Sequence, residues 1–99
     1  MIIVTTETVP GKAIAEVKGL VRGITVQEKQ TGTFGSLLGG EMDSYNEMLD
    51  AAVKIAIGRM VEDAKRQGAN AIIGMQLMSS TIVHGAAEMV AYGTAVVVK

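Results

Sequence analysis

The 99-residue sequence contains no cysteine and no tryptophan, and it has a single histidine, a single proline, two tyrosines and one phenylalanine. The lack of cysteine excludes disulfides, thiolate metal sites and cysteine nucleophiles. One histidine would have to fill every histidine role of a catalytic triad, and no serine stands in a G-x-S-x-G setting. Hydrolase chemistry is therefore not indicated, and no catalytic residue is assigned.

Long apolar runs and clustered charges are also missing. No stretch approaches the roughly 20 apolar residues that cross a bilayer, and the start MIIVTTETV lacks the basic residues and the apolar length of a signal peptide. Nine basic and ten acidic residues give a formal net charge of −1 and are scattered along the chain. We therefore expect a cytoplasmic protein that binds neither membranes nor nucleic acid.

What the chain has in excess is apolar surface. Hydrophobic residues make up 48% of the sequence and charged residues 19%, and the mean hydropathy is +0.34. A chain of this length forms one domain, residues 1–99, and a monomer of that size hides this much apolar surface with difficulty. The composition therefore predicts assembly with further copies of the same chain.

Alternating or β-branched apolar residues predict four strands, over residues 2–6, 12–27, 70–84 and 88–98. In the second strand, small apolar residues share one face, which is expected to look inward and to let a helix approach: Ala13, Ala15, Val17, Gly19 and Val21. Gly19 and Gly23 are expected to mark bends or bulges in that strand.

A long helix is predicted between the second and third strands, because apolar residues recur with the helical period from Tyr45 to Ala64 and form a stripe along one face. It is expected to begin at the S-x-x-E capping box of Ser44 and Glu47 and to end before Gly68. Glu62 and Arg66 are spaced for an i,i+4 ion pair. The order β-β-α-β-β predicts an α+β fold in which one long helix covers one face of a four-stranded, largely antiparallel sheet, so that the other face needs shelter.

The segment TGTFGSLLGG, residues 31–40, carries large apolar side chains in a loop-like composition. Such side chains usually pack against something, so we expect them to contact a neighbouring subunit, with a lid over a ligand as the alternative. The residues expected at this interface or ligand site are Phe34, Leu37, Leu38, Glu41 and Tyr45.

Two pairs of residues, one acidic and one of histidine with glutamate, are candidates for metal binding. Glu41 and Asp43 follow the glycine pair and could hold a hard divalent cation or act as acid and base, although their charge also suits a helix amino terminus. His84 and Glu88 stand four residues apart, and copies from several subunits could converge. The simpler interpretation of a lone histidine is a solvated turn residue, and that of the seven methionines is core packing rather than copper(I) binding.

Several motifs together resemble the YbjQ-like family over nearly the whole chain. They are Gly39-Gly40-Glu41 followed by Tyr45, the pair Arg59-Met60, GANAIIG at 68–74 and EMVAYGTAV at 88–96. The resemblance implies a β-β-α-β-β subunit in a ring-shaped homopentamer, among small bacterial and archaeal proteins without an established biochemical function. The family label mentions heavy-metal binding. The chain departs from many relatives in the TGTFGSLL loop and at Met75–Ser79, where relatives tend to carry charge.

Three functions are compatible with this sequence. The first is a non-enzymatic oligomeric module that binds a small ligand or partner. The second is a metal-binding protein that uses carboxylates and His84 at subunit interfaces, with a divalent metal as the cofactor. The third is an enzyme with interfacial carboxylates. We rank them in that order.

The loop prediction has a direct test. Changing Phe34 and Leu38 together to aspartate should shift the protein toward monomers, because it places charges in a desolvated contact. Size-exclusion chromatography with light scattering measures the outcome. An oligomer that is unchanged would mean that the loop is not buried between subunits, and it would favour the lid.

Overall fold

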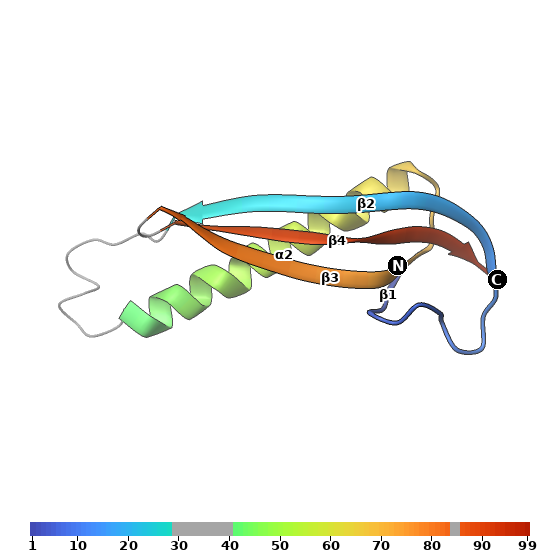
Figure 1. The fold of residues 1–99 in the computed structure, drawn as a ribbon, viewed down its shortest axis with the longest axis horizontal. Helices are drawn as coiled ribbons and strands as arrows, with labels where there is room; N and C mark the ends of the chain where they lie inside the picture. Colours follow the sequence, from blue (N-terminus) through green and yellow to red (C-terminus); the bar gives the residue numbers. More distant parts are fainter. Residues whose placement is uncertain (29–40, 84–85) are drawn as a thin grey trace.

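A computed structural model describes residues 1–28, 41–83 and 86–99. It contains one four-stranded sheet with strand order β1-β3-β4-β2 and one long helix, α2, on one face of the sheet (Figure 1). The elements follow the chain in the predicted β-β-α-β-β order, with these bounds: β1 Ile2–Ile3, β2 Ile14–Glu28, α2 Glu41–Arg66, β3 Ala71–Val83 and β4 Ala86–Val98. The α+β fold predicted from the sequence is confirmed.

The sheet is mixed. β4 pairs antiparallel with β2 and with β3, whereas β1 pairs parallel with β3. The first ladder is shorter than predicted, but backbone pairing continues past it, because the Val4 amide donates to the Ile72 carbonyl at 2.9 Å and the Gly74 amide to the Thr6 carbonyl at 2.8 Å. The amino-terminal strand lies at the outer side of β3, opposite the side occupied by β4.

A bulge changes which residues of β2 face the helix. The pairing register with β4 shifts between Val17 and Gly19, and Gly19 has a φ of 121°, a left-handed conformation that favours glycine. Val21 is fully buried beneath α2 as predicted, but Val17 is 63% exposed. The prediction that Val17 faces inward is wrong, because an extra residue in one strand reverses the alternation of side chains beyond it.

The helix begins earlier than the capping box predicted. α2 starts at Glu41, so Ser44 lies within the helix and cannot be its N-cap residue. The carboxyl end follows the prediction: Gly68 has a φ of 81°, and the amides of Gly68 and Ala69 donate to the carbonyls of Lys65 and Ala64 at 3.0 and 3.1 Å. These two bonds form a Schellman motif, which ends the helix and turns the chain into β3. In the described ranges, no helix has both the length and the apolar character needed to cross a membrane.

The main core lies between α2 and the sheet. Every fourth residue along one face of the helix is fully buried: Ala52, Ala56, Met60 and Ala64. They pack with Val21, Ile72 and Ala91 of the sheet in one cluster. The predicted apolar stripe is confirmed, and its small side chains bring the helix backbone close to the strands.

A second, smaller cluster lies on the other face of the sheet. Val96 and Val98 of β4 are buried with Val9 and Ala71, and Ile2 and Val4 pack beside them. Ala95 belongs to the core under α2, and neighbouring residues of a strand point to opposite faces, so Val96 points away from the helix. The amino-terminal segment therefore shelters part of the face that α2 leaves open.

The helix and the sheet approach each other closely at Gly23, and this contact gives a paired stability prediction. A Cβ atom at Gly23 would overlap the Ala56 carbonyl oxygen and lie 2.5 Å from the Met60 amide nitrogen, whereas one at Gly58 meets nothing within 4 Å. Gly23→Ala should lower the free energy of unfolding by about 3 kcal/mol or more, because the helix must move. Gly58→Ala should raise it by about 0.5–1 kcal/mol, because alanine is the better helix former. Urea denaturation measures both, and equal effects would contradict the close approach.

Candidate functional site

A groove of about 710 Å³ runs between α2 and the outer edge of β2. β2 lies at the end of the sheet order, so one side of this strand has no neighbouring strand among the described residues. The groove is lined by three strand residues, Arg22, Gly23 and Ile24, and by five helix residues, Ile55, Gly58, Arg59, Glu62 and Arg66.

Side chains of α2 bind backbone groups on the open edge of β2. The Arg59 Nη1 donates to the Ile24 carbonyl at 2.6 Å, and the Arg22 amide donates to Asp63 Oδ2 at 3.4 Å. These outward backbone groups would pair with another strand in the middle of a sheet. A guanidinium and a carboxylate from the helix take the place of that strand, and they hold the helix against the edge.

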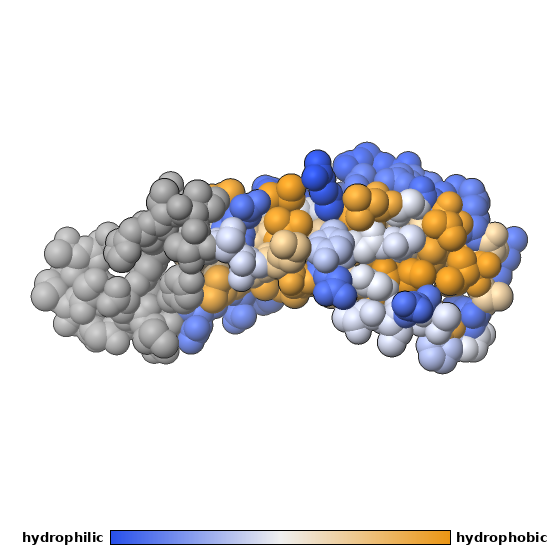
Figure 2. Space-filling model, viewed as in Figure 1, coloured by the Kyte–Doolittle hydropathy of each residue, from blue (hydrophilic) through white to orange (hydrophobic). Residues whose placement is uncertain are grey.

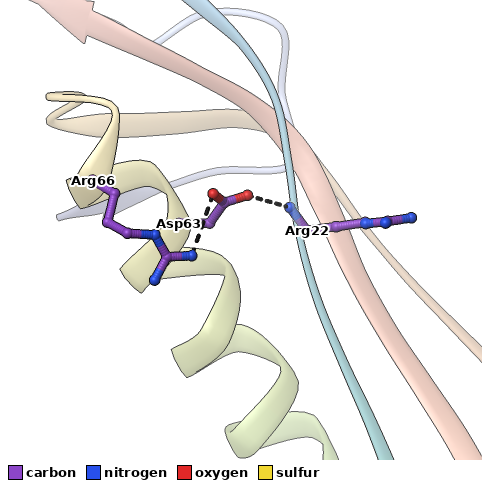
Figure 3. Close-up of polar contacts among 3 residues, drawn as sticks. All are labelled: Arg22, Asp63 and Arg66. Carbon is purple, nitrogen blue, oxygen red and sulfur yellow. Dashed lines mark hydrogen bonds and ion pairs between the residues drawn. The ribbon is translucent and has the colours of Figure 1, made fainter.

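Asp63 connects the strand edge to a second arginine. Its Oδ1 lies 3.5 Å from Arg66 Nη2, while its Oδ2 faces the Arg22 amide (Figure 3). The predicted ion pair between Glu62 and Arg66 does not form between these two described residues; Arg66 pairs with Asp63 instead. Asp63 is turned toward β2, and its side chain is 29% exposed against 71% for Arg66. Figure 3 also shows that the Arg22 side chain extends away from Asp63.

The groove concentrates positive charge. All three arginines of the sequence line it, whereas Glu62 is its one acidic lining residue. Because the Arg22 side chain extends away from the helix (Figure 3), the charges that face the groove are those of Arg59 and Arg66 against Glu62, an excess of one positive charge in a chain whose formal net charge is −1. Guanidinium groups present several N–H donors in a fixed plane and match the geometry of carboxylates and phosphates. The arrangement is suited to binding an anion.

The residues predicted from the sequence lie elsewhere. Phe34, Leu37, Leu38 and His84 fall outside the described residues. Glu41, Asp43 and Tyr45 contribute backbone to the first turns of α2. Figure 1 places this start of the helix at the same end of the molecule as the far ends of β2 and β3.

Glu88 is the one predicted metal candidate whose side chain is described. It is half-buried on β4, lies beside a hollow of about 100 Å³, and its Oε2 is 3.5 Å from the Ser80 hydroxyl. It does not line the groove. Among the described residues, no group of three or more histidine, cysteine, aspartate or glutamate side chains gathers to hold a metal ion.

The sequence reasoning missed the groove. One signal was present, since Arg59 and Arg66 are seven residues apart and therefore share a face of a helix. Arg22 could be placed beside them only by the packing of two elements that are distant in the sequence, and that packing has no local signature.

The geometry defines a class of protein: an α+β domain whose described residues form one long helix on an elongated mixed sheet, with an arginine-lined groove at the edge of the sheet. The family model described as "Putative heavy-metal-binding", the YbjQ family, matches residues 1–99. The chain therefore belongs to this family, as its motifs indicated.

Relatives occur in bacteria and archaea. The chain is 62% identical to a UPF0145 protein of Clostridium perfringens, over 98% of this chain and 96% of the relative. It is 51% identical to one of Halalkalibacterium halodurans, over 100% and 98% of the two chains. It is 46% identical to one of Methanosarcina acetivorans, over 97% and 95%.

A solved structure shares the fold. It is a protein of unknown function of the DUF74 family from Pediococcus pentosaceus, with a TM-score of 0.73 and 21% identity, and the match covers 100% of this chain and 98% of that one. At this identity the likeness concerns the fold alone.

The residues of this chain do not fit the soft-metal site that the family description names. Soft metals prefer thiolates or several imidazoles, and the sequence has no cysteine and one histidine. Met48, Met60 and Met89 are buried in the core, as the packing interpretation predicted. No step of the function proposed below uses a metal.

The two helix arginines should differ in their effect on stability. Arg59→Met keeps the aliphatic length but removes the donor to the Ile24 carbonyl, so the free energy of unfolding should fall by about 1 kcal/mol. Arg66→Gln removes a largely exposed pair and should change it by less than about 0.5 kcal/mol. Urea denaturation of both variants tests this order, and a larger loss for Arg66→Gln would contradict it.

Proposed function

We propose that the protein is a homo-oligomeric binding module without catalytic activity, whose copies pack through the sheet face that α2 leaves open. The observation that carries this proposal is a set of exposed apolar side chains on that face. Leu20 is 68% exposed, Met78 57% and Val26 54%. The pairing register supports a common face. Leu20 pairs with Thr94 of β4, and Met78 and Ile24 both pair with Val90. Val90, Tyr92 and Thr94 are alternate residues of β4, so they point to the same side of the sheet.

The face is extensive because three strands contribute to it. On β2, the residues that alternate with buried Val21 and Gly23 point away from α2. In Figures 1 and 2 the strands lie in front of α2, and hydrophobic residues form patches along this side of the molecule between hydrophilic ones. Covering one exposed leucine, valine or methionine side chain stabilises an assembly by about 1.5–3 kcal/mol. Several such side chains on each copy favour association.

A ring of five copies is our expectation for the assembly, and it comes from the family resemblance. The exposed face supports the need for partner copies but does not fix their number. We place this module in the cytoplasm, in keeping with the expectation from composition.

Native mass spectrometry combined with elemental analysis of the same sample tests the assembly. We expect a species of five times the 10.3 kDa chain mass, without stoichiometric metal. A monomer would overturn the proposal. A metal that survives dialysis in fixed stoichiometry would instead support the metal-binding alternative, with ligands drawn from several copies.

The face can be tested by matched variants. Leu20→Asp combined with Val26→Asp should shift the oligomer toward monomers, because burying a carboxylate in an apolar contact costs several kcal/mol. Ile55→Asp is the control, since Ile55 is an exposed apolar residue on α2, at the groove rather than on the open sheet face. Sedimentation velocity measures the outcome. Dissociation by Ile55→Asp alone would assign the interface to the helix side.

A further inference from the structure

We propose that the groove between α2 and the edge of β2 binds a small ligand that carries oxyanionic groups, carboxylate or phosphate, through Arg59 and Arg66. This inference rests on the proposed function in that it names the ligand class of the binding module. It concerns a different surface, because the groove lies at the edge of the sheet on the helix side, whereas the proposed oligomer contact is the open sheet face.

The distribution of arginine is the first support. On α2, both arginines, Arg59 and Arg66, line the groove, and neither of the two described lysines, Lys54 and Lys65, does. Both residue types would serve to keep a surface soluble, but they differ in recognition, since the planar guanidinium donates two parallel N–H bonds to an oxyanion and is less strongly hydrated than an ammonium group. Selective placement of arginine points to an oxyanion rather than to general surface charge.

The second support is that the Arg59 guanidinium is held firmly and the Arg66 guanidinium has a longer, more exposed contact. Arg59 uses Nη1 for the Ile24 carbonyl at 2.6 Å, so its Nη2 and Nε donors remain for a ligand. Arg66 is oriented by Asp63 through Nη2 at 3.5 Å, so its Nη1 and Nε donors likewise remain. A side chain that is already oriented loses less conformational freedom when it binds a ligand.

The spacing of the charges describes the ligand further. Arg59 and Arg66 are two helical turns apart, about 10 Å along the axis, and Glu62 lies between them on the same side of the helix. An anion directly over Glu62 would be repelled, whereas a ligand with two oxyanionic groups can place one near each arginine. Gly23 and Gly58, which also line the groove, leave its floor free of side chains.

The experiment is a titration followed by nuclear magnetic resonance of the full-length protein labelled with ¹⁵N-arginine. Because the sequence has three arginines, three Nε–Hε signals are expected, and Arg→Lys variants assign them. The probes are pyrophosphate and citrate, with sodium chloride of matched ionic strength as the control for screening. Isothermal titration calorimetry gives the affinity and the number of sites per chain.

We expect saturable binding at one site per chain, with shifts of the Arg59 and Arg66 signals that chloride does not reproduce. Arg59→Gln and Arg66→Gln should each weaken binding by about tenfold or more, which is the effect of losing a charged hydrogen bond. Lys54→Gln is the matched control, because it removes one positive charge from the same helix outside the groove lining. It should change the affinity by less than about twofold.

Arg59→Gln also removes the bond to Ile24, so circular dichroism and thermal unfolding must show that each variant is folded. Arg66→Gln retains that bond and keeps the test decisive if Arg59→Gln is unstable. If neither pyrophosphate nor citrate binds saturably up to about 10 mM, the proposal is overturned. Equal weakening by Lys54→Gln would also overturn it, because the attraction would then be general rather than local.

The two probes distinguish the two kinds of oxyanionic group, phosphate and carboxylate, that the arginines could bind. Binding of pyrophosphate but not citrate assigns phosphoryl groups, and the reverse assigns carboxylates. The outcome is independent of assembly: a monomer that binds through Arg66 would refute the proposed oligomer and retain the groove. An oligomer without oxyanion binding would refute the groove and retain the oligomer.

Discussion

The close approach of the α2 backbone to β2 at Gly23 is the contact on which the other features of the structure depend. It is possible because the strand residue has no side chain and because the helix presents alanines, Ala52 and Ala56, on its buried face. At this separation the side chains of Arg59 and Asp63 reach the edge of the strand and bind its backbone. A larger residue at position 23 would move the helix outward and separate both side chains from the strand.

This contact also divides the surface of the molecule into two regions. Among the described residues, α2 covers one face of the sheet and leaves most of the opposite face uncovered. The amino-terminal segment shelters one part of that face with Val9, while Leu20 and Met78 stay exposed. The groove belongs to the covered side. The surface proposed for self-assembly and the surface proposed for ligand binding therefore lie on opposite sides of the sheet and meet at the edge of β2, where Ile24 lines the groove.

The family relationship covers the whole domain, but the heavy-metal description of the family does not match the side chains of this chain. The relatives in Clostridium perfringens and Methanosarcina acetivorans align over almost their full length, so the whole domain is the shared unit. The family description refers to heavy metals, but this chain has no cysteine and one histidine. Arginine donors, by contrast, are gathered in one place. For this member, the chemistry of the described residues favours an anionic ligand over a soft metal.

Much of the fold was predictable because its determinants are local. The order of elements follows from side-chain periodicity, and the end of α2 follows from Gly68, whose positive φ completes the Schellman motif. The predicted start of α2 at Ser44 and the inward face of Val17 were wrong. The second error arose because a bulge at Gly19 reverses the faces of β2, and an alternating pattern read from the sequence does not show the extra residue. The first arose because the S-x-x-E pattern occurs within the first turns of the helix as well as at its start.

The sequence by itself therefore determined the α+β class, the strand order along the chain, the buried stripe of the helix and the excess of apolar surface. The tertiary structure alone decided the groove. Arg22 and Arg59 are 37 residues apart in the sequence, and they line one surface only because a glycine lets two elements pack closely. Periodicity records which face of an element is apolar, but it does not record which polar residues of two elements meet at the edge of a sheet.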